Sequence, residues 1–200
     1  MNRAVWFALL AVAVVALLVV PTFADMVALS LTPSTLTSPA QTPFDLFLDI
    51  AGLGNGTALG AYDVVVTFDP LLVSFSSVTF GDPVFGDQLD LEGFGTLTQA
   101  TPAHGSVELF ELSFDSSAAL LQMQSGAFTL ADLTFMGKAA GTTQIDVAIV
   151  ALADQNGGGI DANVSGAAVT VFTPEPSTLL LLAPGVFSLG VIRRRALSKG

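Results

Sequence analysis

Two stretches of this chain alternate apolar and polar side chains with a period of two, and this alternation constrains the fold more than any other feature. In each stretch the apolar positions share one face: Phe44, Leu46, Leu48 and Ile50 in the first, and Tyr62, Val64, Val66 and Phe68 in the second. Successive side chains of a β-strand point to opposite faces, so the pattern predicts half-buried strands rather than helices. Asp69-Pro70 ends the second stretch, because proline cannot donate to a strand ladder.

The whole region between residues 25 and 172 predicts strands. We expect about nine short strands, and the ranges assigned to them are residues 27–31, 44–50, 59–68, 73–79, 106–114, 128–136, 143–153 and 160–172. Residues 81–101 predict a long excursion with room for one short strand, and residues 116–124 predict a short helix or 3₁₀ turn. Short strands separated by turn signals are typical of an all-β sandwich.

The first 24 residues predict a secretory signal peptide. One basic residue, Arg3, precedes an apolar run over residues 4–20, and Thr22-Phe23-Ala24 places small residues three before and one before a cut. Cleavage after Ala24 is the expected outcome. A permanent N-terminal anchor is the alternative, because the run is long for a signal peptide. In both cases the chain after Ala24 is expected to be exported.

The last stretch, residues 173–195, has three parts in a fixed order. A short polar motif, Pro174, Glu175, Pro176 and Ser177, precedes an uncharged apolar run over residues 178–192, and the run ends at three arginines, Arg193, Arg194 and Arg195. Clustered arginines after an apolar run predict a stop in the membrane with the basic end on the cytoplasmic side. The run reaches only roughly 22 Å as a helix, against about 30 Å of hydrocarbon, so it predicts a transmembrane helix that anchors temporarily.

This terminal stretch resembles the PEP-CTERM sorting signal, which combines a Pro-Glu-Pro motif, an apolar helix and an arginine cluster. The matching residues are Pro174-Glu175-Pro176, Ser177 to Leu182, and Arg193 to Arg195, and residues 196–200 would form a short cytoplasmic tail. The resemblance implies that the export machinery and a membrane protease, an exosortase, process the chain. It also implies transient anchoring in the inner membrane of a Gram-negative bacterium, followed by transfer to the cell surface or the exterior.

The charge of the middle region excludes some partners. Every acidic residue except Glu175 lies between residues 25 and 172, whereas Lys138 is the only base there, which gives this region a formal charge of −15. Such a surface repels nucleic acid and anionic headgroups, so no nucleic-acid partner is expected. The chain has no cysteine, so burial rather than disulfides must stabilise the single domain of residues 25–172.

A second resemblance covers most of this domain, which is similar to cohesin-type domains. The motifs that carry it are Gly60-Ala61-Tyr62, the strand ending at Phe68-Asp69-Pro70, and the later segment of residues 130–160. The resemblance implies a jelly-roll β-sandwich of about nine strands, related in shape to carbohydrate-binding modules. Cohesins of cellulosomes bind dockerin modules, but nothing in this sequence identifies a dockerin partner.

Residues 154–161 raise the question of a calcium site. Asp154, Asn156 and Asp161 offer oxygen ligands around a glycine-rich turn, as calcium loops do. The twelfth position of such a loop is Ser165, not the bidentate glutamate of an EF-hand. We therefore expect a glycine-rich hairpin loop here and keep a calcium site as the alternative. No other cofactor is expected.

The residue types present argue against catalysis. His104 is the only histidine and stands in a turn segment, and without cysteine neither a nucleophilic triad nor a histidine-based metal site can be assembled. Glycoside hydrolysis needs two carboxylates that flank one bond. Glu108 and Glu111 are three positions apart on one strand, so they are expected to project from opposite faces.

Four phenylalanines raise the question of an aromatic platform for sugars: Phe80, Phe85, Phe94 and Phe110. Sugar-binding platforms favour Trp and Tyr, and the chain has one of each, with the Trp in the predicted signal peptide. We therefore expect these four side chains to lie in the core.

Together the patterns predict a non-enzymatic surface or matrix protein. Its sandwich is expected to contact a partner protein or extracellular polysaccharide. A carbohydrate-binding module of a polysaccharide-degrading system is the alternative. A small hydrolase is a third interpretation, which the residue types disfavour.

Overall fold

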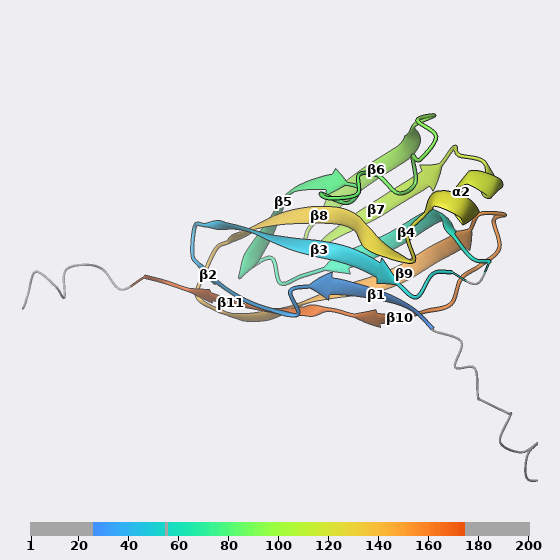
Figure 1. The fold of residues 1–200 in the computed structure, drawn as a ribbon. Coiled ribbons are helices and arrows are strands. Elements are labelled where there is room, and N and C mark those ends of the chain that lie inside the picture. The colour runs from blue at the N-terminus through green and yellow to red at the C-terminus, as the bar shows by residue number, and fades with distance from the viewer. Residues whose placement is uncertain (1–25, 55, 175–200) are drawn as a thin grey trace, which may run out of the picture.

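A computed structural model describes residues 26–54 and 56–174, which form two stacked β-sheets and one short helix (Figure 1). The five-stranded sheet has the order β10-β1-β3-β8-β5. Its strands are β1 (Val27–Thr32), β3 (Pro43–Ala51), β5 (Val73–Phe80), β8 (Ala127–Gly137) and β10 (Ala162–Ser165). The six-stranded sheet has the order β2-β11-β9-β4-β7-β6. Its strands are β2 (Thr35–Pro39), β4 (Leu59–Thr67), β6 (Thr96–Ala103), β7 (Ser106–Ser113), β9 (Gly141–Asp154) and β11 (Ala167–Phe172).

The alternating stretches become β3 and β4, and they face each other across the core. Leu46, Leu48, Val64 and Val66 are fully buried between the sheets, whereas Asp45 on the other face of β3 is exposed. Burying each such aliphatic side chain contributes about 1.5–3 kcal/mol. The all-β sandwich predicted from the alternation is therefore confirmed, with eleven strands in the described residues rather than about nine.

Both ends of the domain cross from one sheet to the other. β1 pairs with β3 in the five-stranded sheet, and the next strand, β2, pairs with β11 in the six-stranded sheet. In the same way β10 lies parallel to β1, whereas β11 lies between β2 and β9. The single strand predicted over residues 160–172 is therefore wrong, because this segment forms two strands in different sheets.

Gly166 marks the crossing between β10 and β11. A Cβ atom at this position would collide with the backbone carbonyl oxygen of Ile145 and lie 2.7 Å from Oδ1 of Asp146. Real Cβ atoms do not approach backbone oxygen that closely. The lack of a side chain at Gly166 therefore lets the chain pass close to β9 as it changes sheets.

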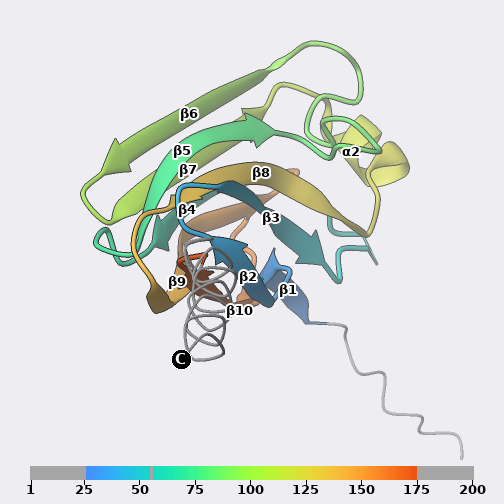
Figure 2. The same cartoon turned by 90° about the vertical axis from the view of Figure 1, so that its left-hand side faces the viewer.

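Helix α2 (Ser117–Met123) lies at one end of the sandwich in both views (Figures 1 and 2). The side chain of Ser116 caps it by accepting a hydrogen bond of 3.2 Å from the backbone N–H of Ala119. Past the helix, the Gln124 side chain accepts from the backbone N–H of Leu59 and donates to the backbone oxygens of Leu59 and Gln88. The short helix predicted over residues 116–124 is confirmed.

Several predicted features lie outside the described residues. They are the signal peptide with its cleavage site at Ala24, the apolar segment, Glu175, Pro176, Ser177, the arginine cluster of Arg193, Arg194 and Arg195, and the tail of residues 196–200. All of these stay predictions. Pro174 is the last described residue and is exposed, two positions after the end of β11. Between residues 26 and 174, no helix is long and apolar enough to cross a membrane.

Replacing Gly166 with alanine should destabilise the sandwich by about 1–3 kcal/mol, because the new methyl group overlaps the β9 backbone. Thermal melting of the full chain in a non-ionic detergent, followed by far-UV circular dichroism, measures the effect. Gly159→Ala is the matched control, since a Cβ atom at Gly159 would meet nothing within 4 Å. Equal melting temperatures for the two variants would contradict the close approach.

Candidate functional site

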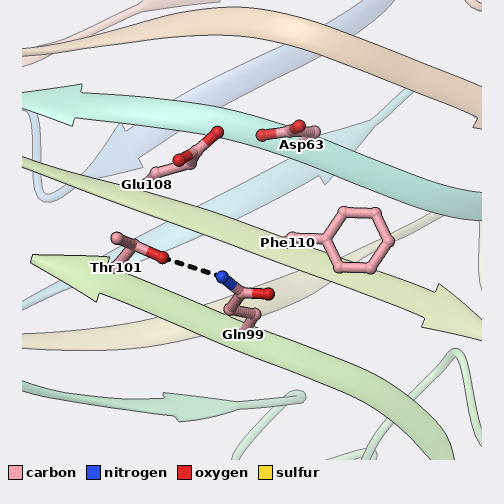
Figure 3. A pocket seen from close by; sticks show the side chains of 5 residues that line it. All are labelled: Asp63, Gln99, Thr101, Glu108 and Phe110. Atoms are coloured by element: carbon pink, nitrogen blue, oxygen red, sulfur yellow. Dashed lines mark hydrogen bonds between the residues drawn. The ribbon is translucent and has the colours of Figure 1, made fainter.

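The outer side of β4, β7 and β6 carries a shallow hollow with a volume of about 240 Å³. We call this side the outer face and define it by the residues lining the hollow, Asp63, Gln99, Thr101, Glu108 and Phe110 (Figure 3). Strand pairing brings them together: Phe110 on β7 lies between Asp63 on β4 and Gln99 on β6. Glu108 lies two residues from Phe110 on β7 and pairs with Thr101 on β6.

The polar groups of the outer face are only partly satisfied. Gln99 donates a hydrogen bond of 3.0 Å from Nε2 to the Thr101 hydroxyl. The carboxylates of Asp63 and Glu108 point toward one another between β4 and β7 in Figure 3. Asp63 Oδ1 is buried and accepts no hydrogen bond from the described residues. A buried acceptor without a donor is costly, and of this carboxylate only the other oxygen, Oδ2, is left to accept a hydrogen bond from a partner.

Exposed apolar side chains adjoin the hollow. Leu97 on β6 pairs directly with Leu112 on β7. This pair lies two residues along the strands from the pair of Gln99 and Phe110, on the same face. Leu97 is 52% exposed, Leu112 is 36% exposed, and Val150 on β9 is 59% exposed. Large apolar side chains gathered on one face are typical of a binding surface. The outer face can therefore bury apolar groups of a partner while its acids accept hydrogen bonds.

Glu111 lies behind the outer face, in the core. It is fully buried, and neither carboxylate oxygen has a hydrogen-bond partner among the described residues. Burial, and then the nearby charge of Asp87, raise the pKa of Glu111 from its ordinary 4.5 to about 8. Glu108 and Glu111 therefore project from opposite faces of β7, as predicted, and cannot flank one bond.

The remaining polar candidates are the single histidine and the acids that could ligate a metal. His104 is exposed in the turn between β6 and β7. Within the described residues, no group of three or more His, Asp or Glu side chains could hold a metal ion.

The loop after β9 has the geometry of a tight turn. Asp154 Oδ1 accepts hydrogen bonds from the backbone N–H groups of Asn156, at 2.7 Å, and Gly158, at 2.8 Å. This agrees with the expected glycine-rich hairpin loop, because the Asp154 carboxylate accepts hydrogen bonds from its own loop. Asp161 is exposed just before β10. Calcium binding by Asp154, Asn156 and Asp161 stays a prediction.

The expectation that four phenylalanines lie in the core is wrong for three of them, because only Phe80 packs against the core, whereas Phe85, Phe94 and Phe110 lie outside it. Phe85 is 65% exposed and Phe94 is 67% exposed. The physical reason is local at Phe85: Asp82 Oδ1 accepts from the backbone N–H of Phe85 and holds the turn. Phe85 lines a hollow of the five-stranded sheet whereas Phe110 lines the outer face, so the two do not share one platform.

No protein-family model matches the sequence, and the comparison with curated proteins gives no match either. Solved structures of cohesins do match. The cohesin of a type I cohesin–dockerin complex from Clostridium thermocellum has a TM-score of 0.58 at 8% identity, over 74% of this chain and all of that one. The fold is that of a cohesin module.

Two further structures support this result. A non-cellulosomal cohesin from the archaeon Archaeoglobus fulgidus has a TM-score of 0.54 at 11% identity, over 75% of this chain and 94% of that one. A cohesin module of a family 33 glycoside hydrolase from Clostridium perfringens has a TM-score of 0.55 at 12% identity, over 74% and 97%. At these identities the likeness establishes a cohesin-like fold and leaves the partner to be argued from the site.

Sequence reasoning did not predict the outer face of this cohesin-like sandwich. The alternation of β4 already placed Asp63 on the side opposite Tyr62, and this was the available signal. The sequence left room for one short strand in residues 81–101 but did not locate β6, because Leu97, Thr98 and Gln99 are all exposed and the strand carries no apolar alternation. Without β6, the pairing that brings Gln99 beside Phe110 cannot be seen.

The buried Glu111 predicts a specific pH dependence of stability. The unfolded chain releases the Glu111 proton near pH 4.5, whereas the folded chain keeps it until about pH 8. Between these values the folded state binds more protons, so stability should fall as pH rises, by about 1.4 kcal/mol per unit.

Glu111→Gln should remove this slope. Urea unfolding of both proteins from pH 4 to pH 9 measures it, and the variant should gain stability over the parent as pH rises to about 8. Parallel curves over this range would show that Glu111 ionises normally in the folded protein.

Proposed function

We propose that this chain is an exported, non-catalytic binding protein whose cohesin-like sandwich holds a partner protein on the outer face. One observation carries the proposal: the exposed pair Leu97 and Leu112 lies two residues along the strands from Phe110, which pairs with the acid Asp63. Apolar area supplies binding free energy, and a carboxylate selects partners that provide a hydrogen-bond donor. The matching fold in a Clostridium thermocellum cohesin–dockerin complex supports a protein partner.

The negative charge of the domain further limits the kind of partner that the outer face can bind. Lys138 is the only base between residues 26 and 174, and its Nζ donates at 2.6 Å to the backbone oxygen of Pro70. Asp63 and Glu108 line the hollow on the solvent side of the sheet. Because Lys138 donates to Pro70 instead, no base of the described residues pairs with these two carboxylates. A partner with lysine, arginine or amide donors beside apolar side chains complements this face.

The proposal includes delivery by the two terminal segments. The signal peptide directs export, and the PEP-CTERM-like segment holds the chain in the inner membrane until an exosortase acts near Pro174 to Ser177. The product belongs to the cell surface or extracellular matrix of a Gram-negative bacterium. The acidic sandwich supports this location, because a high net charge keeps an exported domain soluble.

A carbohydrate-binding module remains the second candidate function. The observation that favours it is the mixed lining of the hollow, where Phe110 lies among Asp63, Gln99, Thr101 and Glu108. An aromatic ring bordered by carboxylates, an amide and a hydroxyl offers both the apolar surface and the hydrogen bonds that a sugar needs. Exopolysaccharide would be the natural ligand of such a site.

Replacing Leu112 with aspartate should weaken partner binding at least about tenfold, because it places a charge in the apolar patch that the partner is proposed to cover. The partner is purified from the extracellular fraction of the native host, and its affinity for the full chain is measured by biolayer interferometry. Leu71→Asp is the matched control, since Leu71 is 74% exposed in the turn before β5. Equal losses in both variants would refute the outer face. Saturable binding of the full chain to one polysaccharide on a glycan array, with no protein partner, would favour the second candidate.

Intact-mass spectrometry of the protein recovered from its native host should show an N-terminus at Asp25 and a C-terminus within residues 174–177. The terminal segments serve delivery in this proposal, so the mature chain has no further use for them. A mature chain that begins at Met1 would contradict cleavage of the signal peptide. One that ends at Gly200 would indicate permanent anchoring instead of exosortase processing.

A further inference from the structure

A second hollow lies on the outer side of the five-stranded sheet, across the sandwich from the outer face. Its volume is about 350 Å³, and its lining includes Phe47, Asp49, Asp82, Val84, Phe85 and Thr129. Phe47 and Asp49 project to this side because the alternate residues of β3 are buried in the core. We call this hollow the Phe47 pocket.

One carboxylate builds the rim of the Phe47 pocket. β5 ends at Phe80, and Asp82 Oδ2 accepts the backbone N–H of Thr129 on β8 at 2.9 Å. Asp82 Oδ1 accepts the backbone N–H groups of Val84, at 2.7 Å, and Phe85, at 2.9 Å. The turn is thereby fastened to the sheet and leaves Val84 82% exposed and Phe85 65% exposed.

The pocket carries negative charge that no nearby base neutralises. Asp49 accepts the hydroxyls of Thr32 and Thr129, which holds its carboxylate in the lining. Burial tends to raise the pKa of Asp82, but the hydrogen bonds from Thr129, Phe85 and Val84 outweigh it and lower the pKa, so this carboxylate is ionised at neutral pH. The only base of the described residues, Lys138, donates to the Pro70 oxygen instead.

A further acid lies directly beside the pocket. Asp132 on β8 pairs with Phe47, and its Oδ1 is buried without a hydrogen-bond partner among the described residues. Asp45 lies two positions before Phe47 on the same face of β3. Burial, and then the charge of Asp45, raise the pKa of Asp132, so a cation placed between these two acids would be favoured.

Two phenylalanines and two carboxylates around one hollow suit an organic cation. The aliphatic stem of lysine or arginine packs on apolar surface, and its charged end is attracted both by aromatic faces and by carboxylates. Anions are repelled by Asp49 and Asp82. The chain's own arginine cluster is predicted to end on the cytoplasmic side, away from the exported sandwich. We propose that the Phe47 pocket binds a lysine or arginine side chain from a basic segment of a partner protein.

The test is a titration of the ¹⁵N-labelled full chain, in a non-ionic detergent, with an acetylated and amidated Gly-Arg-Leu-Arg-Leu-Gly peptide. We expect saturable chemical-shift changes at the backbone amides of Val84, Phe85 and Thr129, with affinity that falls as salt is raised. The same peptide with glutamine in place of arginine should bind at least about fivefold more weakly, since it lacks the charge. Equal binding of the glutamine peptide would overturn the proposal in favour of an apolar occupant.

Two variants assign the effect to the pocket. Asp49→Asn and Phe85→Ala should each weaken peptide binding by about fivefold or more, because they remove one charge and one aromatic face. Asp146→Asn makes the same charge change at an exposed site on the other sheet, and Leu71→Ala removes an exposed apolar side chain elsewhere, so both should bind as the parent does.

Other results would overturn the proposal. Unchanged affinity in both Asp49→Asn and Phe85→Ala would do so, and so would shifts confined to the amides near Asp63 and Glu108. Calcium chloride that saturates the same pocket amides and displaces the peptide would point to an inorganic cation. None of these results bears on the loss expected for Leu112→Asp, so the two binding sites are tested independently.

Discussion

The structure depends on the pairing of both ends of the domain with both sheets. β1 and β10 lie parallel in the five-stranded sheet, and β2 and β11 lie parallel in the six-stranded sheet. The terminal strands therefore hold one flank of the sandwich together, because each end of the domain contributes one hydrogen-bonded strand to each sheet. The ladder of β11 ends at Phe172, so a cut within residues 174–177 would leave this ladder intact. Processing at the predicted motif is thus compatible with an intact sandwich.

The two outer sides of the sandwich differ in what they offer. The outer face combines an apolar pair, Leu97 and Leu112, with the partly buried carboxylate of Asp63, whose Oδ1 has no hydrogen-bond partner among the described residues. The opposite side carries a larger hollow beside Phe47, bordered by Asp82, which fastens its own loop. Both sides are acidic in a region with a single base, Lys138. Both sides therefore favour positively charged groups, while the shape and the apolar area of the two sides differ.

Prediction from sequence succeeded where the signal was local. The alternation of β3 and β4, and the short helix predicted over residues 116–124, depend on neighbours in the chain, and the structure has all three. The predictions failed where strand pairing alone decides the structure. Residues 160–172 divide into two strands at Gly166, and β2 and β6 were not located because they carry no apolar alternation. Phe85 lies at the surface because the Asp82 side chain, not hydrophobicity, sets the path of its turn.

By itself, the sequence determined that the middle of this chain is an acidic, cysteine-free β-sandwich with a single histidine. Composition and period-two alternation suffice for that, because each is a property of residues close together in the chain. Only the tertiary structure decided which side chains share a face. Asp63 lies beside Phe110, and Asp82 holds Thr129, through contacts between residues 47 positions apart in each case. Such contacts arise when strands distant in sequence pair in register, and no local pattern encodes that choice.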